Sequence, residues 1–213
     1  MRPRFVLAAF VSAVPSSAAR IALYRLLFGY RIDSRAKIGP FTVIDVSSAD
    51  IGAARLRGMC LFRGPFRLEI GDRTAIGSWN DFECGEWVKE ARSEAQAYAR
   101  ECQIGSDCLI TAGHFFDATD RMSIGDRTWI AGRSSQVWTH GAGTEKRSVV
   151  IGNDCYIASR VAFAPGSALG EGCLATVGSV IAERFQTKNA IVGGVPAVLI
   201  REGWDWRRRM PAA

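Results

Sequence analysis

Histidine is scarce in this chain, and its scarcity excludes whole classes of site. The 213 residues include two histidines, His114 and His140. Zinc enzymes that hold their metal with three histidines are therefore excluded. Any mechanism that needs a histidine base near neutral pH has only these two candidates. None of the six cysteines stands in a Cys-x-x-Cys pair, so neither a zinc ribbon nor a thioredoxin-like site is supported. We expect no metal.

Lysine and long uncharged segments are also lacking. The chain has four lysines, so its formal net charge of +6 comes almost entirely from arginine. Outside the basic tail at 203–213, the arginines form no stripe with interleaved aromatic residues. Nucleic acid is therefore not an expected partner, and an anionic small ligand or membrane surface fits better. No 18-residue run is free of charge, which excludes a polytopic membrane protein, while 48% apolar residues suffice for a packed core.

A six-residue repeat runs through most of the chain. Ile-Gly pairs open at 38, 51, 70, 104, 124 and 151. Hexads in one phase start at residues 70, 76, 82, 104, 110, 116, 124, 130, 136, 151, 157, 163, 169, 175 and 181. Thirteen of these fifteen starts are Ile, Leu or Phe, and the exceptions are Gln136 and Ala175. Such a repeat predicts a solenoid, in which each hexad gives one short strand with its large apolar residue pointing inward and three hexads form one coil.

The same phase accounts for several cysteines. The fifth residue of the first hexad in each coil is Thr74, Cys108, Thr128, Cys155 or Cys173. We expect these small residues to form an inward-facing column in which the thiols fill the core, because burial makes a thiol a poor nucleophile.

Both ends of the repeat carry different segments. Residues 1–33 have two apolar stretches with spaced arginines, separated by Pro15-Ser16-Ser17 and followed by Gly29, which predicts two short helices. We interpret them as a cap on the main domain, with contact to a membrane surface as the first alternative and a cleaved signal peptide as the second. The solenoid then spans 34–202, and 203–213 form a basic C-terminal tail.

Three interruptions break the repeat. In the insertion at 85–103, the spacing of Trp87, Ala91, Ala95 and Tyr98 predicts a short amphipathic helix, which we interpret as a packing or subunit-contact arm rather than a catalytic lid. Two extra residues precede Ile124. The polar loop at 141–150 follows His140 directly, so this histidine stands at the exit from a coil, where solenoids often carry function.

The segment at 151–183, IGNDCYIASRVAFAPGSALGEGCLATVGSVIAE, and the closing GVPAVLI at 194–200 carry a family resemblance. With the phased hexads, residues 36–202 resemble the hexapeptide-repeat acyltransferases, and specifically the branch that acetylates sugars and polysaccharides. Tyr156 stands where that pattern usually has Trp, and Ala158 where it has Gly. The resemblance implies a left-handed parallel β-helix, acetyl-CoA as acyl donor, and a homotrimer with sites between subunits.

The resemblance also implies the chemistry. We expect O-acetylation of a sugar hydroxyl, in surface polysaccharide biosynthesis, with His140 as general base, since an unperturbed histidine has a pKa of about 6.5. Asp120, one coil earlier in the same hexad position, or Asp117 would assist it; the alternative is that both aspartates make turns. His114 is the rival base, although it lies inside regular coil.

Further residues are candidates for binding. Asn80, His114 and Trp138 would contact the acceptor, although each is also a plausible ladder or packing residue. The resemblance places coenzyme A along the later coils, at Ala158, Gly178, Ser179, Lys188 and Arg201. The alternatives for these are a corner turn at Gly178 and a solvated charge at Arg201.

Two other functions stay open: N-acylation of an amino sugar or another amine, and a non-catalytic β-helix scaffold. We expect a cytoplasmic protein, with a peripheral position at the inner face of the membrane through residues 1–30 as a further hypothesis.

Overall fold

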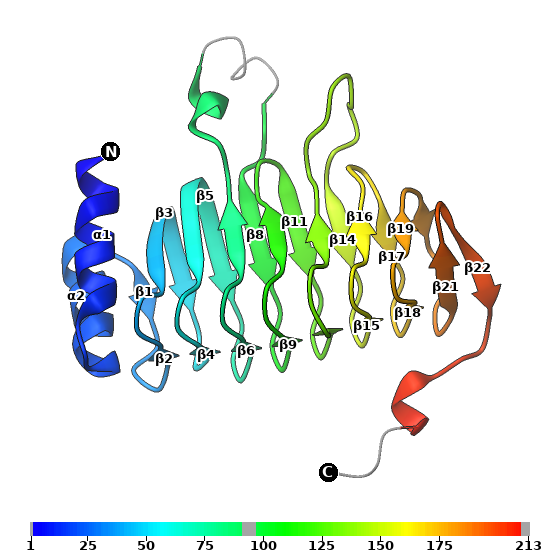
Figure 1. Ribbon diagram of the computed structural model, residues 1–213, viewed down its shortest axis with the longest axis horizontal. Coiled ribbons are helices and arrows are strands. Elements are labelled where there is room, and N and C mark those ends of the chain that lie inside the picture. Colours follow the sequence, from blue (N-terminus) through cyan, green and yellow to red (C-terminus); the bar gives the residue numbers. More distant parts are fainter. Residues whose placement is uncertain (1, 91–96, 210–213) are drawn as a thin grey trace.

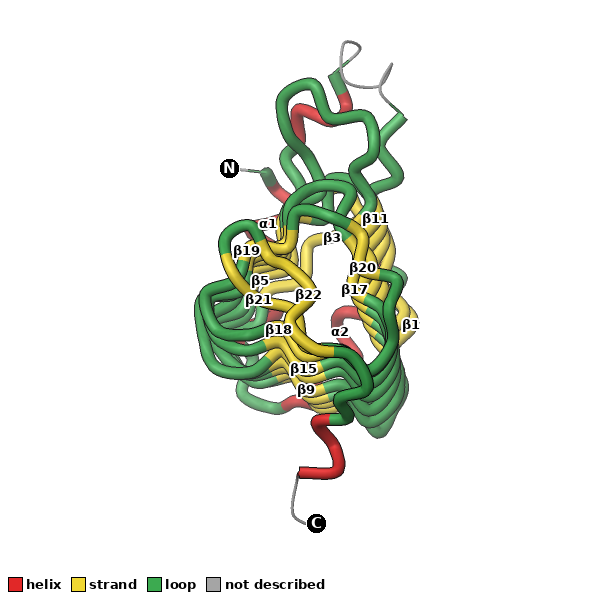
Figure 2. The backbone as a smooth tube through the Cα atoms, turned by 90° about the vertical axis from the view of Figure 1, so that its right-hand side faces the viewer, coloured by secondary structure: helices red, strands yellow, loops and turns green. Residues whose placement is uncertain are grey.

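The repeat folds into a parallel β-helix with three faces. The computed structural model describes residues 2–90 and 97–209 (Figure 1). Viewed along its axis, the chain winds around one central core in closely superposed coils (Figure 2). Each coil contributes one strand to each face, and the strands of successive coils pair in parallel.

The strands group by face. The first face holds β1 (Arg31–Ile32), the ends of β3 (Val43–Ile51) and β5 (Leu61–Ile70), β8 (Glu101–Ile104), β11 (Arg121–Ile124), β14 (Val149–Ile151), β17 (Ala168–Leu169) and β20 (Arg184–Phe185). The second holds β2 (Lys37–Ile38), β4 (Arg55–Leu56), β6 (Ala75–Ile76), β9 (Leu109–Ile110), β12 (Trp129–Ile130), β15 (Tyr156–Ile157), β18 (Leu174–Ala175), β21 (Ile191–Gly194) and β22 (Ala197–Arg201). The third holds the starts of β3 and β5, then β7 (Asp81–Glu83), β10 (Phe115–Asp117), β13 (Gln136–Val137), β16 (Ala162–Phe163) and β19 (Val180–Ile181).

The predicted inward columns are confirmed. Ile70, Ile104 and Ile124 pair in register on the first face and are buried. On the third face Phe62, Phe82 and Phe116 stack almost parallel, with ring centroids 4.6 and 4.3 Å apart. Because identical positions of successive coils stand about one strand spacing apart, flat rings fill such a column without gaps.

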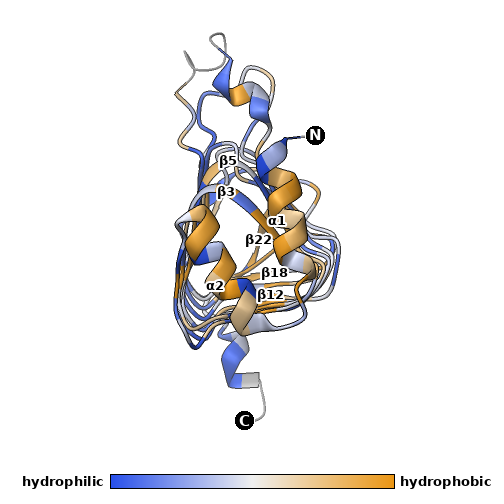
Figure 3. Cartoon of the chain, turned by 90° about the vertical axis from the view of Figure 1, so that its left-hand side faces the viewer, coloured by the Kyte–Doolittle hydropathy of each residue, from blue (hydrophilic) through white to orange (hydrophobic). Residues whose placement is uncertain are grey.

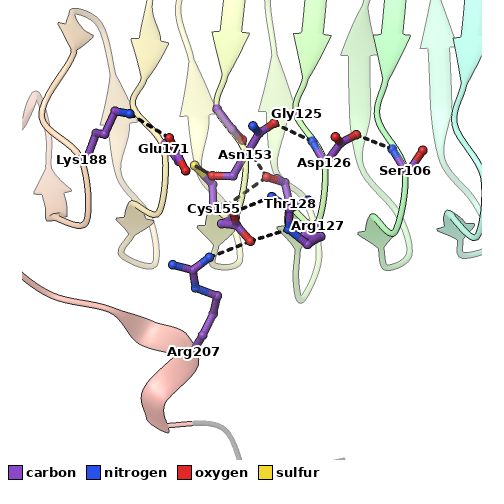
Figure 4. A network of polar contacts seen from close by, with 12 residues as sticks. Ser106, Gly125, Asp126, Arg127, Thr128, Asn153, Cys155, Glu171, Lys188 and Arg207 are labelled. Carbon is purple, nitrogen blue, oxygen red and sulfur yellow. Dashed lines mark hydrogen bonds and ion pairs between the residues drawn. The ribbon is translucent and has the colours of Figure 1, made fainter.

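The column of small residues at the first corner, between the first and second faces, is a hydrogen-bonded ladder (Figure 4). Thr128 Oγ1 donates to the Gly152 carbonyl at 2.7 Å and accepts from the Cys155 amide at 3.0 Å. The Cys155 thiol in turn lies 3.1 Å from the Gly170 carbonyl. Burial raises the pKa of Cys155 to about 12, which keeps the thiol protonated and unreactive.

One expectation about the repeat was wrong. The hexad predicted to start at Gln136 starts one residue later, because Val137 pairs with Phe116 and is buried while Gln136 is exposed. The extra residue lies in the preceding corner, where Ser134 has a left-handed φ of 61°. The shift also puts Ser135, rather than Ser134, beside His114.

Two helices close the N-terminal end, as expected: α1 (Pro3–Ala13) and α2 (Ser17–Phe28), with Ser16 as N-cap and Gly29 as left-handed C-cap. Their polar side chains pair with the open edge of the first coil. The Tyr24 hydroxyl donates to the Thr42 carbonyl at 3.0 Å and accepts from the Ile44 amide at 3.1 Å. The helices therefore protect a strand edge that has no further coil to pair with.

The other end is closed differently. Strand β22 turns back and pairs with β21 in antiparallel fashion. The basic tail then packs against the second face through the 3₁₀ helix η2 (Trp206–Arg209), where buried Trp206 donates to the Asp154 carbonyl at 2.7 Å and contacts Trp129 and Tyr156. Arg207 pairs with Asp154 (Figure 4).

The insertion and the polar loop rise from the same corner, between the third and first faces (Figure 1). The described part of the insertion contains the 3₁₀ helix η1 (Glu86–Lys89), which is shorter than the helix predicted from Trp87 to Tyr98. Ala91 and Ala95 lie outside the described residues. Among the described residues, no helix has the length and apolar character needed to cross a membrane.

Candidate active site

The site is centred on His140, the last residue of its coil before the polar loop. Its Nδ1 lies 2.7 Å from Oδ2 of Asp117, the last residue of β10 on the neighbouring coil. The Asp117 side chain is 4% exposed and that of His140 is 36% exposed. The carboxylate can only accept, so Nδ1 carries the proton and Nε2 keeps its lone pair. No other described residue forms a hydrogen bond with the ring.

Asp117 is fixed from both sides. Its Oδ2 also accepts from the Thr139 amide at 2.7 Å and from the Thr139 hydroxyl at 3.0 Å. Its Oδ1 accepts from the amide of Thr119 at 3.0 Å and from the same residue's hydroxyl. A buried carboxylate with this many donors has one orientation, and it transfers that orientation to the imidazole.

Asp120 lies in a different arrangement from the one expected. No hydrogen bond or ion pair joins it to His140; its Oδ2 accepts from Arg147 Nε at 2.9 Å, and its backbone amide donates to Thr139 Oγ1 at 2.9 Å. The one-residue register shift explains the difference, because it moves His140 out of the hexad position that Asp120 holds. Asp120 instead anchors the polar loop through Arg147.

The insertion takes part in the site, which the sequence reasoning missed. The Trp87 ring lies 5.4 Å from the His140 ring and 5.5 Å from that of Tyr98. The Arg147 guanidinium lies over Tyr98 at 4.2 Å, so arm and loop are joined beside the histidine. At Gly85 a Cβ would lie 2.1 Å from Trp87 Nε1, so only glycine lets the indole fold back. This Gly-x-Trp spacing was the available signal.

Trp138 also borders the histidine. It is 37% exposed, its ring lies 6.5 Å from that of His140, and it packs against Phe115 at 4.8 Å. The structure thus places an accessible aromatic face within the site, as an acceptor contact would require.

His114 lies in the core, away from any opening. It is 2% exposed; its Nδ1 accepts from the Ser135 amide at 3.1 Å, and its Nε2 lies 3.0 Å from Thr111 Oγ1. Burial, and then the Arg133 charge, lower its pKa to about 4. A neutral, fully bonded imidazole cannot reach a substrate, so the structure corrects both roles suggested for His114, base and acceptor contact.

Asn80 and Ser179 are corrected for the same reason. Both are fully buried. Asn80 donates to the Gly77 and Thr111 carbonyls and accepts from the His114 amide at 2.9 Å. Ser179 donates to the Thr176 carbonyl at 2.7 Å. Both side chains belong to a column of buried, hydrogen-bonded residues at the second corner, between the second and third faces.

The remaining residues suggested for coenzyme A are not brought together. Ala158 and Gly178 lie on neighbouring coils near the second corner, where the Gly178 amide bonds to the Ser159 carbonyl. Lys188 lies at the first corner and pairs with Glu171 at 3.0 Å (Figure 4). Arg201, on β22, lies over the Trp204 ring at 4.8 Å. These positions therefore lie at different corners of the chain and on its last strand.

Comparisons with known proteins show which fold the chain shares with solved structures. No family model matches the chain, and no curated protein matches its sequence. A UDP-N-acetylglucosamine acyltransferase structure is 18% identical with a TM-score of 0.52, over 80% of this chain and 68% of that one.

Two further structures are similar over more of the chain. A hexapeptide-repeat acetyltransferase from Vibrio cholerae O1 biovar eltor, complexed with acetyl coenzyme A, is 20% identical over 95% of this chain and 86% of that one, with a TM-score of 0.47. A polysialic acid O-acetyltransferase is 18% identical over 85% and 88%, with a TM-score of 0.48. The likeness to the UDP-N-acetylglucosamine acyltransferase, at a TM-score of 0.52, shows that the chain adopts the fold of a left-handed parallel β-helix.

Proposed function

We propose that this protein is an acyltransferase that moves an acetyl group from acetyl-CoA to a sugar hydroxyl, with His140 as general base. The observation that carries the proposal is the 2.7 Å contact between His140 Nδ1 and buried Asp117, which leaves Nε2 free to accept a proton. The fold shared with an acyltransferase supports the reaction class by analogy.

The proposed chemistry needs no covalent enzyme intermediate. Nε2 of His140 takes the proton from the acceptor hydroxyl as that oxygen attacks the thioester carbonyl carbon. The carbon–sulfur bond then breaks, and the imidazolium returns its proton to the departing thiolate. Asp117 stabilises the imidazolium between these steps and holds the ring in place.

Radiolabelled acetyl-CoA offered with a panel of neutral sugars, amino sugars and simple amines tests this proposal. We expect ester formation on a sugar hydroxyl by the wild type and a loss of at least 100-fold in His140→Ala. Transfer to amines alone would favour the N-acylation alternative. No transfer to any acceptor, or an unchanged rate in the folded His140→Ala protein, would contradict the proposal and favour a scaffold.

We further propose a homotrimer, as the resemblance implies. Light scattering on the purified protein should give three times the mass of one chain, and the mass of a single chain would refute it.

We also propose a cytoplasmic protein that touches the inner face of the membrane and serves surface polysaccharide synthesis. Much of α1 and α2 is hydrophobic (Figure 3), and two of their apolar side chains are strongly exposed, Phe10 at 71% and Leu26 at 78%, which supports this proposal. Phe10→Ser with Leu26→Ser should abolish co-flotation with anionic vesicles. Val177→Ser, at an equally exposed apolar residue far along the chain, should not.

A further inference from the structure

A basic groove on the second face is independent of the candidate active site. It has a volume of about 490 Å³ and runs across β4, β6 and β9 to the second corner. Arg55, Arg57 and Arg133 contribute to its walls, Ala75 and Ala112 lie among its small lining residues, and Trp79 stands at the corner. No aspartate or glutamate lines it. We call this cavity the Arg–Trp groove.

Most other arginines on the solenoid form ion pairs with carboxylates, and among the described residues the three arginines of the groove do not. Arg63, Arg73 and Arg127, for example, each pair with a carboxylate of an adjacent coil. Within the described ranges, Arg55, Arg57 and Arg133 form no ion pair. Their charges are therefore concentrated around one cavity without local compensation, which favours an anion with more than one charge.

Trp79 gives the groove a second property. The residue has a left-handed φ of 64°, and its side chain is 61% exposed. This conformation is common at the second corner, where Gly113 and Gly178 adopt it, as do Met59, Ser134 and Arg160. What distinguishes Trp79 is its exposed indole, which offers a flat face on which a ring can stack.

Its position separates the groove from His140. The second corner and His140 lie at opposite ends of the third-face strand, and the six residue-to-residue steps from Ser134 to His140 span up to ~20 Å when extended. A ligand in this groove therefore has contacts of its own and is not simply part of the His140–Asp117 site.

We propose that the Arg–Trp groove binds a nucleoside diphosphate group, with the arginines on the phosphates and the base stacked on Trp79. Arginine matches phosphate oxygens with paired N–H donors, and indole stacks on any base. Two molecules present this group: an acyl-CoA, through its adenosine diphosphate end, and a nucleotide-activated sugar.

Calorimetric titration of the full chain tests the groove without any acyl transfer, so its outcome is independent of the proposed function. ADP and UDP supply the two nucleotides, inorganic pyrophosphate the charge alone and adenosine the ring alone. We expect at least one nucleotide to bind more tightly than pyrophosphate, with affinity that falls as salt rises, and adenosine not to bind measurably.

Matched variants locate the binding. Arg57→Gln and Trp79→Ala should each weaken nucleotide binding at least tenfold, and Trp79→Gly, which adopts a left-handed φ readily, should weaken it equally. Arg160→Gln, an exposed arginine at the same corner of a later coil, should bind as the wild type does. No nucleotide binding, or equal affinity in all folded variants, would overturn the proposal. Preference for ADP and coenzyme A points to the acyl donor, and preference for UDP and a UDP-sugar to an activated sugar.

Discussion

At the scale of single residues, two histidines of the same chemistry have opposite environments. His140 is half-buried at a coil exit and shares a hydrogen bond with a buried carboxylate. His114 is buried, neutral and bonded through both ring nitrogens. One ring is therefore placed to exchange protons with a bound molecule, while the other joins two adjacent coils of the core.

Asp117 should matter for catalysis through His140. In Asp117→Asn an amide replaces the acceptor of the Nδ1 proton, so we expect kcat for acetyl transfer to fall at least 100-fold with little change in the KM for acetyl-CoA. The control Asp107→Asn, at an exposed carboxylate paired with Arg73, should keep full activity. Asp120→Asn should lower kcat less than Asp117→Asn; the reverse order would show that the loop anchor, not the ring partner, limits the reaction.

His114 should make the fold sensitive to acid. Its pKa is about 4 in the folded chain and about 6.5 when unfolded, so the unfolded chain binds more protons between these values. The contribution of His114 to the free energy of unfolding is therefore fully present above pH 6.5. It is lost as the pH drops toward 4, which lowers that free energy by up to about 3 kcal/mol.

His114→Asn removes this titration and keeps an acceptor of the kind that Asn80 provides in the same column. Urea unfolding at pH 7 and pH 4.5 should show a smaller acid loss in the variant than in the wild type. Equal losses in the two proteins would contradict the assignment.

 At the scale of elements, the insertion and the polar loop meet beside His140, although the contacting residues Tyr98 and Arg147 are 49 positions apart in the sequence. Trp87 and Tyr98 belong to the insertion and Arg147 to the loop, and their ring and cation contacts meet beside His140. Arg147 is fixed in turn by its ion pair with Asp120. The contact of Trp87 with His140 thus comes from the insertion, which leaves the solenoid more than one coil earlier. The insertion rises from the corner between the third and first faces, as the polar loop does (Figure 1).

Trp87 should therefore affect the reaction more than the fold. Trp87→Ala removes the ring that packs against His140, so we expect kcat/KM for the acceptor to fall about tenfold, an effect in the range of a misplaced catalytic group. Because Trp87 is only half-buried, the midpoint of thermal unfolding should change little.

The control for this variant is Trp204→Ala, which truncates an indole on the C-terminal extension, where it contacts Arg201. It should leave kcat/KM unchanged. A Trp87→Ala protein with full activity would show that the insertion only packs, as the sequence interpretation favoured.

At the scale of the whole molecule, the solenoid depends on how its two ends are closed. The side chains of α2 and the residues after it pair with backbone groups of the first coil: Tyr24 with Thr42 and Ile44, and Tyr30 with Val46. The antiparallel pair of β21 and β22 closes the other end. Both devices remove an open strand edge, which is the exposed weak point of any stacked parallel structure.

Removing one of these edge bonds should destabilise the entire chain. Tyr24→Phe keeps the ring but leaves the Ile44 amide and the Thr42 carbonyl without their buried partner, at a cost of about 1–3 kcal/mol. Guanidinium unfolding measures this difference. Tyr156→Phe, at a half-buried tyrosine of the second face, should lose less than half as much, and equal losses would argue against edge pairing by Tyr24.

The regular part of this architecture was predictable because its forces are local and periodic. A large apolar residue every sixth position, followed by a small one, specifies short strands and tight corners, and the buried Ile and Phe columns follow. The N-terminal helices were equally readable from Ser16 and Gly29, whose cap conformations depend on neighbouring residues alone.

The site was only partly predictable. His140 stood out because it precedes a loop, but choosing between Asp117 and Asp120 required the exact pairing of two coils. One extra residue near Ser134 changed that pairing, and a hexad count cannot locate such an insertion. The contact of Trp87 with His140 was beyond prediction for a similar reason, since it joins residues more than fifty positions apart, whereas the Gly-x-Trp spacing indicates only a local fold of the indole.

By itself, the sequence determined the coil, its core columns and the limit of two histidines, because period and composition act through neighbours in the chain or in the next coil. Only the tertiary structure decided which histidine is accessible, which carboxylate holds it, and that Arg55, Arg57, Arg133 and Trp79 surround one cavity. These are distances across coils and around corners, and they depend on register and burial rather than on any local preference of the chain.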